Sequence, residues 1–126
     1  EISIGNDIHR KESYVLEENN EILATVMISC AGESNYNHID GKWLQDDKYL
    51  VIHRIAIRND QKGNGLAKII LDEACKLFDL PSIRIDTHED NLSMQRFLAK
   101  YGFSYCGIIY LENKDTRLAY EKIINK

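Results

Sequence analysis

The sequence predicts an α/β fold: a mixed, mostly antiparallel sheet with a central parallel strand pair and packed helices. Apolar runs with strand periodicity occur in both halves of the chain, and two segments show the apolar spacing of helices. The first helical segment joins the strand-like runs 49–57 and 83–87, and a right-handed crossover of this kind makes neighbouring strands parallel. The 126 residues suit a single domain, 1–126.

The N-terminal part is expected to contain a polar end followed by a hairpin. Residues 1–11 are polar and are interpreted as the end of a helix lost from the chain. Residues 13–17 and 21–30 have the composition of strands, and Glu18-Asn19-Asn20 between them favours a turn. An antiparallel pair of strands is therefore predicted here.

A long loop and three further strands are predicted beyond the hairpin. The polar segment 31–48 is long enough to be functional or mobile, and its Trp43 either caps the core or forms a wall of an acceptor pocket. Residues 49–57 carry apolar side chains on both faces, as expected of a buried central strand. Strands 103–111 and 116–124 complete the sheet.

Two helices are predicted, each after a polar turn. The first begins directly after Gly65. The second begins at Asp90 or Asn91, both good helix caps, and Gly102 ends it. Their apolar faces consist of Ala67, Ile70, Leu71, Ala74 and Phe78 in the first, and of Met94, Phe97, Leu98 and Tyr101 in the second.

The start of the first helix has the properties of an anion site. Amide N–H groups in a first helical turn have no partner within the helix, and the helix dipole favours negative charge there. Gly63 and Gly65 let the backbone approach a ligand closely, and Lys62 and Lys68 add positive charge. The spacing fits neither a P-loop nor a dinucleotide fingerprint. The alternative is a tight connection that binds no ligand.

The run Lys62-Gly63-Asn64-Gly65-Leu66-Ala67 resembles the pyrophosphate-binding loop of the GNAT superfamily of N-acetyltransferases. The family motif is Arg/Gln-x-x-Gly-x-Gly/Ala. Gly65 and Ala67 match this motif, whereas Lys62 stands where Arg or Gln is usual. On this resemblance, the junction is expected to bind the diphosphate of coenzyme A.

A second segment supports the resemblance. Asn91, followed by Phe97, Lys100 and Gly102-Phe103, is similar to the family pattern Asn…Leu-Tyr-x-Lys-x-Gly-Phe. The resemblance covers residues 49–105, and two motifs in the right order are more specific than either alone. It implies a GNAT-like acyl-CoA N-acyltransferase fold that lacks the usual N-terminal strand and helices.

The resemblance implies acetyl-CoA as the acyl donor, and no metal site is predicted. In GNAT proteins the pantetheine arm lies between two central parallel strands, so backbone groups of Ile55, Ala56 and Ile57 are expected to bind it. Asn91 is expected to contact the same arm and to cap the second helix. The pyrophosphate is expected on Lys62, Gly63, Asn64, Gly65, Leu66, Ala67 and Lys68.

Asp86 and His88 are the candidate catalytic residues. An amine must lose a proton before it attacks a thioester, and some family members carry a carboxylate base at the position of Asp86. The alternative for Asp86 is an ion pair with Arg54 or Arg84. Histidine titrates near neutrality, so His88 suits a base; the alternative is a solvated hydrogen-bonding group.

The proton donor and the function class stay open. Leu98 stands where much of the family carries a Tyr that protonates the leaving thiolate, so another tyrosine or water is expected in this role. The substitutes considered are Tyr101, Tyr105 and Tyr110. One function class is an N-acetyltransferase acting on a primary amine of a small molecule or peptide. The other is a non-catalytic acyl-CoA-binding or sensing module.

Composition limits the expected partners. A net charge of −4 without a basic run argues against nucleic acid, and no apolar run approaches the roughly 20 residues that span a bilayer. Cys30, Cys75 and Cys106 are expected to be buried free thiols in a cytoplasmic protein. Homodimers are frequent in the resembling family, although no sequence feature demands one.

Overall fold

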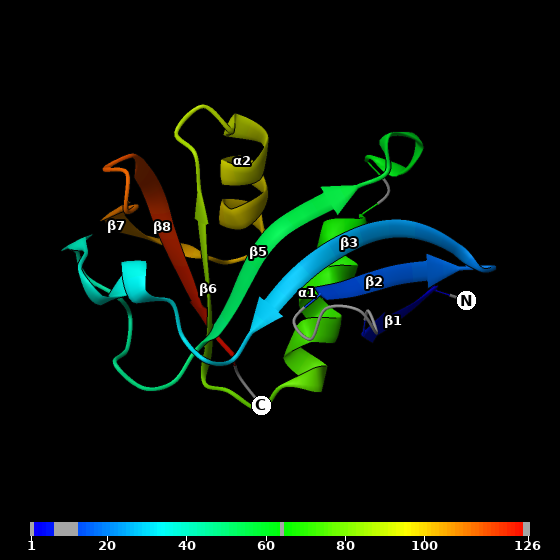
Figure 1. Ribbon diagram of the computed structural model, residues 1–126, viewed down its shortest axis with the longest axis horizontal. Helices are drawn as coiled ribbons and strands as arrows, with labels where there is room; N and C mark the ends of the chain where they lie inside the picture. The colour runs from blue at the N-terminus through cyan, green and yellow to red at the C-terminus, as the bar shows by residue number, and fades with distance from the viewer. Residues whose placement is uncertain (1, 7–12, 64, 125–126) are drawn as a thin grey trace. The chain divides into compact units, whose positions relative to one another are not determined.

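The computed structural model describes residues 2–6, 13–63 and 65–124 (Figure 1). The chain divides into two compact units, Glu1–Ser29 with Ile52–Asp79 and Cys30–Val51 with Leu80–Lys126. Strand β5 (Leu50–Ile57) supplies residues to both units. The strands form a mixed sheet that includes a parallel pair, so the predicted fold class is confirmed.

In the first unit, β1, β2 and β3 pair antiparallel, and a helix packs on the strands. Its strands lie in the order β1-β2-β3-β5, and helix α1 contacts β3. Its elements are β1 (Ile2–Asn6), β2 (Ser13–Glu18), β3 (Glu21–Ser29), the 3-10 helix η2 (Asn59–Gln61) and α1 (Leu66–Leu77). The buried side chains of α1 are Leu66, Ile70, Leu71 and Ala74, which includes most of the predicted apolar face.

The N-terminal strand corrects one expectation. Residues 2–6 do not end a helix but form β1, which pairs with β2 in the register Ile4↔Leu16. Ile2, Ser3 and Ile4 alternate in polarity with the period of a strand, and the edge of β2 supplies backbone partners. Residues 7–11 lie outside the described residues.

The second unit holds the parallel strand pair. Its strands lie in the order β5-β6-β8-β7-β4, with parallel pairing at Leu50↔Ile83 and Val51↔Arg84 and antiparallel pairing at the other contacts. The predicted parallel pairing of these two strands is thus confirmed. The elements are η1 (Ser34–Asn37), β4 (Asp40–Gly41), β6 (Ser82–Thr87), α2 (Leu92–Lys100), β7 (Ser104–Tyr110) and β8 (Thr116–Ile123).

The segment predicted as a long polar loop contributes to the core of the second unit. It contains η1 and β4, and Tyr36 is buried in a cluster with Val51, Ile109 and Ala119. Trp43 packs against this cluster, so its interpretation as a core residue is confirmed. We call residues 33–49 the aromatic loop.

The three cysteines are free thiols but differ in burial. Cys106 is buried, Cys75 is half-buried and Cys30 is exposed, so the expectation of burial is wrong for Cys30. Burial raises the pKa of the Cys106 thiol to about 11, which keeps it protonated near neutral pH. Within the described part of the chain, none of the helices is both long enough and apolar enough to cross a membrane.

Candidate active site

The glycine turn, residues 58–65, connects β5 to α1. Gly63 and Gly65 have φ angles of +86° and +76°, in the left-handed region that residues with a Cβ rarely adopt. A Cβ built on either glycine would have no described heavy atom within 4 Å. Gly65 precedes α1 and has no side chain with which to bind the first amide N–H groups. The N-cap residue of α1 therefore makes no side-chain hydrogen bond to the helix, and the two glycines leave space among the described residues.

The residues predicted to bind the pyrophosphate, 62–68, differ in burial and in their contacts. Leu66 is buried and anchors α1, so it can offer a ligand only its backbone. Lys68 Nζ lies 2.7 Å from Asp72 Oδ2, which offsets part of its positive charge. Lys62, Gly63, Gly65 and Lys68 are exposed, Ala67 is half-buried, and Asn64 lies outside the described residues.

The second half of β5 carries the predicted pantetheine contacts. Ile55 and Ile57 are half-buried and Ala56 is exposed. Arg54 directly before them has a φ of +49°, which is uncommon for a residue with a Cβ. The prediction of a strand buried on both faces holds only for Leu50–Ile52, because the later residues alternate as in a strand with one face toward solvent.

Asp86 lies near the C-terminal end of β6 and is half-buried. The hydroxyl of Tyr36 donates a hydrogen bond to Asp86 Oδ2 over 2.6 Å. Burial and, second, the nearby Asp86 charge raise the pKa of Tyr36 well above its ordinary value near 10. Tyr36 therefore stays protonated and remains a donor. Sequence reasoning missed Tyr36, whose place in a polar loop carried no periodic signal.

Arg84, the arginine of β6, has partners other than Asp86. Arg84 Nε lies 2.9 Å from Glu121 Oε2, and neither side chain is more than 5% exposed. The Arg84 guanidinium stacks 4.1 Å from the Trp43 ring centroid and 3.9 Å from that of Tyr49. Arg84 is thus committed to Glu121 and the aromatic loop, which is not the pairing with Asp86 that was considered from sequence.

The loop after β6 holds the other two predicted residues. His88 is exposed, and its Nδ1 accepts a hydrogen bond from the backbone N–H of Asp90 over 3.0 Å. Asn91 caps α2: its Oδ1 accepts from the N–H of Met94 over 3.1 Å. The predicted cap is confirmed, and the amide oxygen of Asn91 is engaged in the helix.

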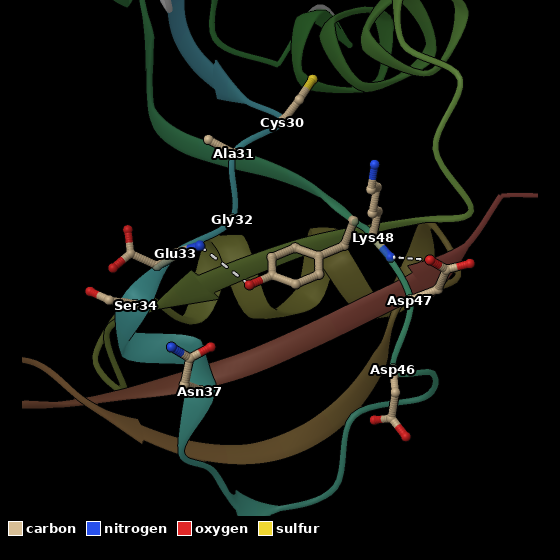
Figure 2. Close-up of a pocket in the computed structure, with 10 residues that line it drawn as sticks. Cys30, Ala31, Gly32, Glu33, Ser34, Asn37, Asp46, Asp47 and Lys48 are labelled. Atoms are coloured by element: carbon tan, nitrogen blue, oxygen red, sulfur yellow. Dashed lines mark hydrogen bonds between the residues drawn. The ribbon is translucent and has the colours of Figure 1, made fainter.

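A polar pocket of about 670 Å³ opens beside the aromatic loop (Figure 2). The Tyr49 hydroxyl on its wall accepts a hydrogen bond from the N–H of Glu33 over 3.2 Å. The N–H of Lys48 donates to Asp47 Oδ1 over 2.7 Å. The lining residues are Cys30, Ala31, Gly32, Glu33, Ser34, Asn37, Asp46, Asp47, Lys48 and Tyr49.

Comparison with known proteins identifies the family. The profile of the acetyltransferase (GNAT) family matches residues 4–103. The chain belongs to this family. No curated protein matches the chain at a significant level.

Solved GNAT structures share its fold. An acetyltransferase of the GNAT family from Streptococcus agalactiae is 39% identical, covering 91% of this chain and 66% of its own, with a TM-score of 0.82. A GNAT acetyltransferase from Listeria monocytogenes is 24% identical, and the match covers 93% of this chain and 67% of that one, with a TM-score of 0.70. A chain of the NatC complex bound to Gag peptide and CoA is 14% identical, and the match covers 91% of this chain and 72% of that one, with a TM-score of 0.65. The last two show the fold alone, and the chain spans about two thirds of the length of the two bacterial relatives.

The position of the usual GNAT tyrosine is part of the core in this chain. Leu98 lies in α2 and has 0% exposure. Of the tyrosines that could serve as proton donor instead, Tyr105 and Tyr110 are exposed, and Tyr110 donates a hydrogen bond to Asp40. Tyr101 stacks on Phe97. Among residues 2–6, 13–63 and 65–124, no group of three or more His, Cys, Asp or Glu side chains is placed to hold a metal ion.

Proposed function

We propose that this GNAT chain transfers an acetyl group from acetyl-CoA to a primary amine, with residues 1–126 acting as one domain in the cytoplasm. Members of the family are acyl-CoA-dependent acetyltransferases. The observation that carries the proposal is the glycine turn. Its left-handed glycines and the N-terminus of α1 suit a diphosphate, which backbone N–H groups at this junction would bind.

The bonds that form and break belong to the two substrates, and the protein supplies hydrogen-bond donors and a base. The amine nitrogen attacks the thioester carbonyl carbon, a C–N bond forms, the C–S bond breaks and coenzyme A leaves as a thiolate. Backbone N–H groups of β5 near Ile55 supply donors for the oxyanion, next to the left-handed Arg54. The thiolate takes its proton from water, because the buried Leu98 has none to give, and the hydroxide left behind removes the proton that the base took from the amine.

Asp86 is assigned as the general base that takes the proton from the attacking amine. It is half-buried and oriented by a hydrogen bond, as general bases in enzymes commonly are. His88 is the alternative base, but its ring is exposed and accepts a hydrogen bond from Asp90. The acceptor class is a primary amine of a small molecule or a peptide.

The test measures thiol release from acetyl-CoA across a panel of small and peptide amines. The full chain should release thiol with at least one amine, and Asp86→Asn should lower kcat about 10²- to 10⁴-fold. His88→Gln is the matched control and should change kcat less than threefold or so. If the chain binds coenzyme A in calorimetry but releases no thiol with any amine, it is a binding or sensing module instead. If it binds no coenzyme A, the glycine turn is only a structural connection.

A further inference from the structure

A buried tyrosine binds the proposed base from a distant part of the sequence. Tyr36 lies in η1 of the aromatic loop, 50 positions before Asp86, and its hydroxyl lies 2.6 Å from Asp86 Oδ2. Tyr36 is 2% exposed, whereas Asp86 is half-buried. A donor inside the core thus binds a carboxylate that is only half-buried.

The position of Tyr36 is itself determined by several contacts. Trp43 Nε1 donates a hydrogen bond to the backbone oxygen of Tyr36 over 3.0 Å. The Tyr36 ring centroid lies 5.1 Å from that of Trp43 and 6.0 Å from that of Tyr49. Glu33 caps η1 by accepting from the N–H of Asn35 over 3.2 Å. Since backbone, ring and helix start are all held, the hydroxyl has little freedom to leave Asp86.

The protonation state of Tyr36 suits a permanent donor. Its surroundings hold the pKa of Tyr36 well above 10, first through burial and then through the Asp86 charge, with smaller contributions from Glu33 and Tyr49. A neutral hydroxyl that donates to a carboxylate forms a short, charge-assisted hydrogen bond. The contact therefore persists throughout the pH range in which an amine acetyltransferase would work.

We propose that Tyr36 is a positioning residue for Asp86, an inference that rests on the proposed function. Because Tyr36 engages Oδ2, the carboxyl group cannot rotate freely, and Oδ1 is the oxygen that accepts the proton of the amine. Arg84, two residues earlier on β6, pairs with Glu121. Tyr36 thus sets the geometry of proton transfer without touching the substrate, and small errors in such geometry are costly in rate.

The test compares two deletions of a single hydroxyl from the aromatic loop. Tyr36→Phe removes the donor to Asp86, whereas Tyr49→Phe removes a hydroxyl that accepts from the N–H of Glu33. Tyr36→Phe should lower kcat about 10- to 100-fold with the KM for acetyl-CoA unchanged. Tyr49→Phe should leave kcat within about twofold of the parent. In the Asp86→Asn background, Tyr36→Phe should have no further effect on kcat.

The outcomes separate the inference from the function on which it rests. An unmodified chain that releases no thiol overturns the proposed function, whatever the variants do. An active chain in which both phenylalanine variants behave alike, or in which Tyr36→Phe still lowers kcat in the Asp86→Asn background, overturns the positioning role.

A spectroscopic measurement covers the case in which Tyr36→Phe does not fold. Tyrosinate absorbance is followed during alkaline titration of the unmodified chain and of Asp86→Asn. Removal of the carboxylate charge should move the ionisation of one tyrosine to lower pH, because Asp86 helps to raise the pKa of Tyr36. Identical titration curves would show that the contact is not made in solution and would overturn the proposal.

Discussion

The glycine turn and the aromatic loop are both irregular connections, but their polar groups have opposite surroundings. In the glycine turn, Arg58 lies 2.6 Å from Asp60 and 3.2 Å from Glu21, and all three side chains are exposed. In the aromatic loop, the N–H of Leu44 donates to buried Glu121 Oε1 over 2.7 Å. Gln45 Nε2 also donates to Glu121 Oε2, over 3.1 Å.

This difference separates a connection that stabilises the fold from one that is available to a ligand. Buried polar groups must find partners within the protein, so the aromatic loop is tied to β6 and β8 by its own hydrogen bonds. The start of α1 differs, because its N-cap residue Gly65 has no side chain with which to bind the first amides. Removal of the buried polar contacts of the aromatic loop should therefore lower stability, whereas substitutions in the glycine turn should also weaken coenzyme binding.

The largest effect is expected from Glu121→Leu. It leaves the Arg84 charge buried without its partner, so the free energy of unfolding should fall by about 3 to 5 kcal/mol in urea titration. Asp72→Ala is the control, because it breaks an ion pair of similar length whose side chains are exposed, and it should cost less than about 1 kcal/mol. Equal losses in the two variants would remove the distinction between the buried and the exposed pair.

The second largest effect is expected from Gly65→Ala. A residue with a Cβ at a φ of +76° should lower the free energy of unfolding by about 1 to 2 kcal/mol. Because the new Cβ enters the open space beside α1, affinity for coenzyme A should fall about tenfold in calorimetry. Gly102→Ala is the control: its φ is +98°, so it should be similarly strained but should bind coenzyme A normally. If both variants keep full affinity, the diphosphate does not bind at the glycine turn.

Stability at alkaline pH should report on the aromatic loop. In the unfolded chain Tyr36 ionises near pH 10, whereas its pKa in the folded protein is higher. The stability that this difference contributes is complete below pH 10 and is lost as pH rises toward the folded pKa. The free energy of unfolding should therefore fall by up to about 1.4 kcal/mol per pH unit from this group. Tyr36→Phe should show a shallower decline above pH 10, and parallel curves would contradict the assignment.

The smallest effect is expected from Lys62→Gln. Lys62 is an exposed cation before the start of α1, so its loss should weaken coenzyme A binding about two- to fivefold at low salt. The difference should shrink in about 0.5 M salt, because exposed charges are screened. Lys42→Gln, an exposed lysine in the aromatic loop, is the matched control and should leave affinity unchanged. A salt-independent loss would indicate that Lys62 acts through packing instead.

Local signals in the sequence predicted most of the secondary structure. The glycines before α1 and the Asn91 cap of α2 lie where expected, because caps and turns depend on a few neighbouring residues. Among the described residues, the strands that the sequence did not predict are β1 and β4. Strand β4 has only two residues, Asp40 and Gly41, and pairs with β7 far along the chain, so no local period could reveal it.

The sequence by itself determined the helices, the crossover between the parallel strands and the glycine turn. These depend on side-chain period and on the backbone freedom of residues close together in the chain. Only the tertiary structure decided that Tyr36 binds Asp86 and that Arg84 pairs with Glu121, partners that are 50 and 37 positions apart. The sequence offers several acids that could accept a hydrogen bond from Tyr36 or Arg84. The actual partner depends on which strands lie side by side and on which polar atoms are buried away from water.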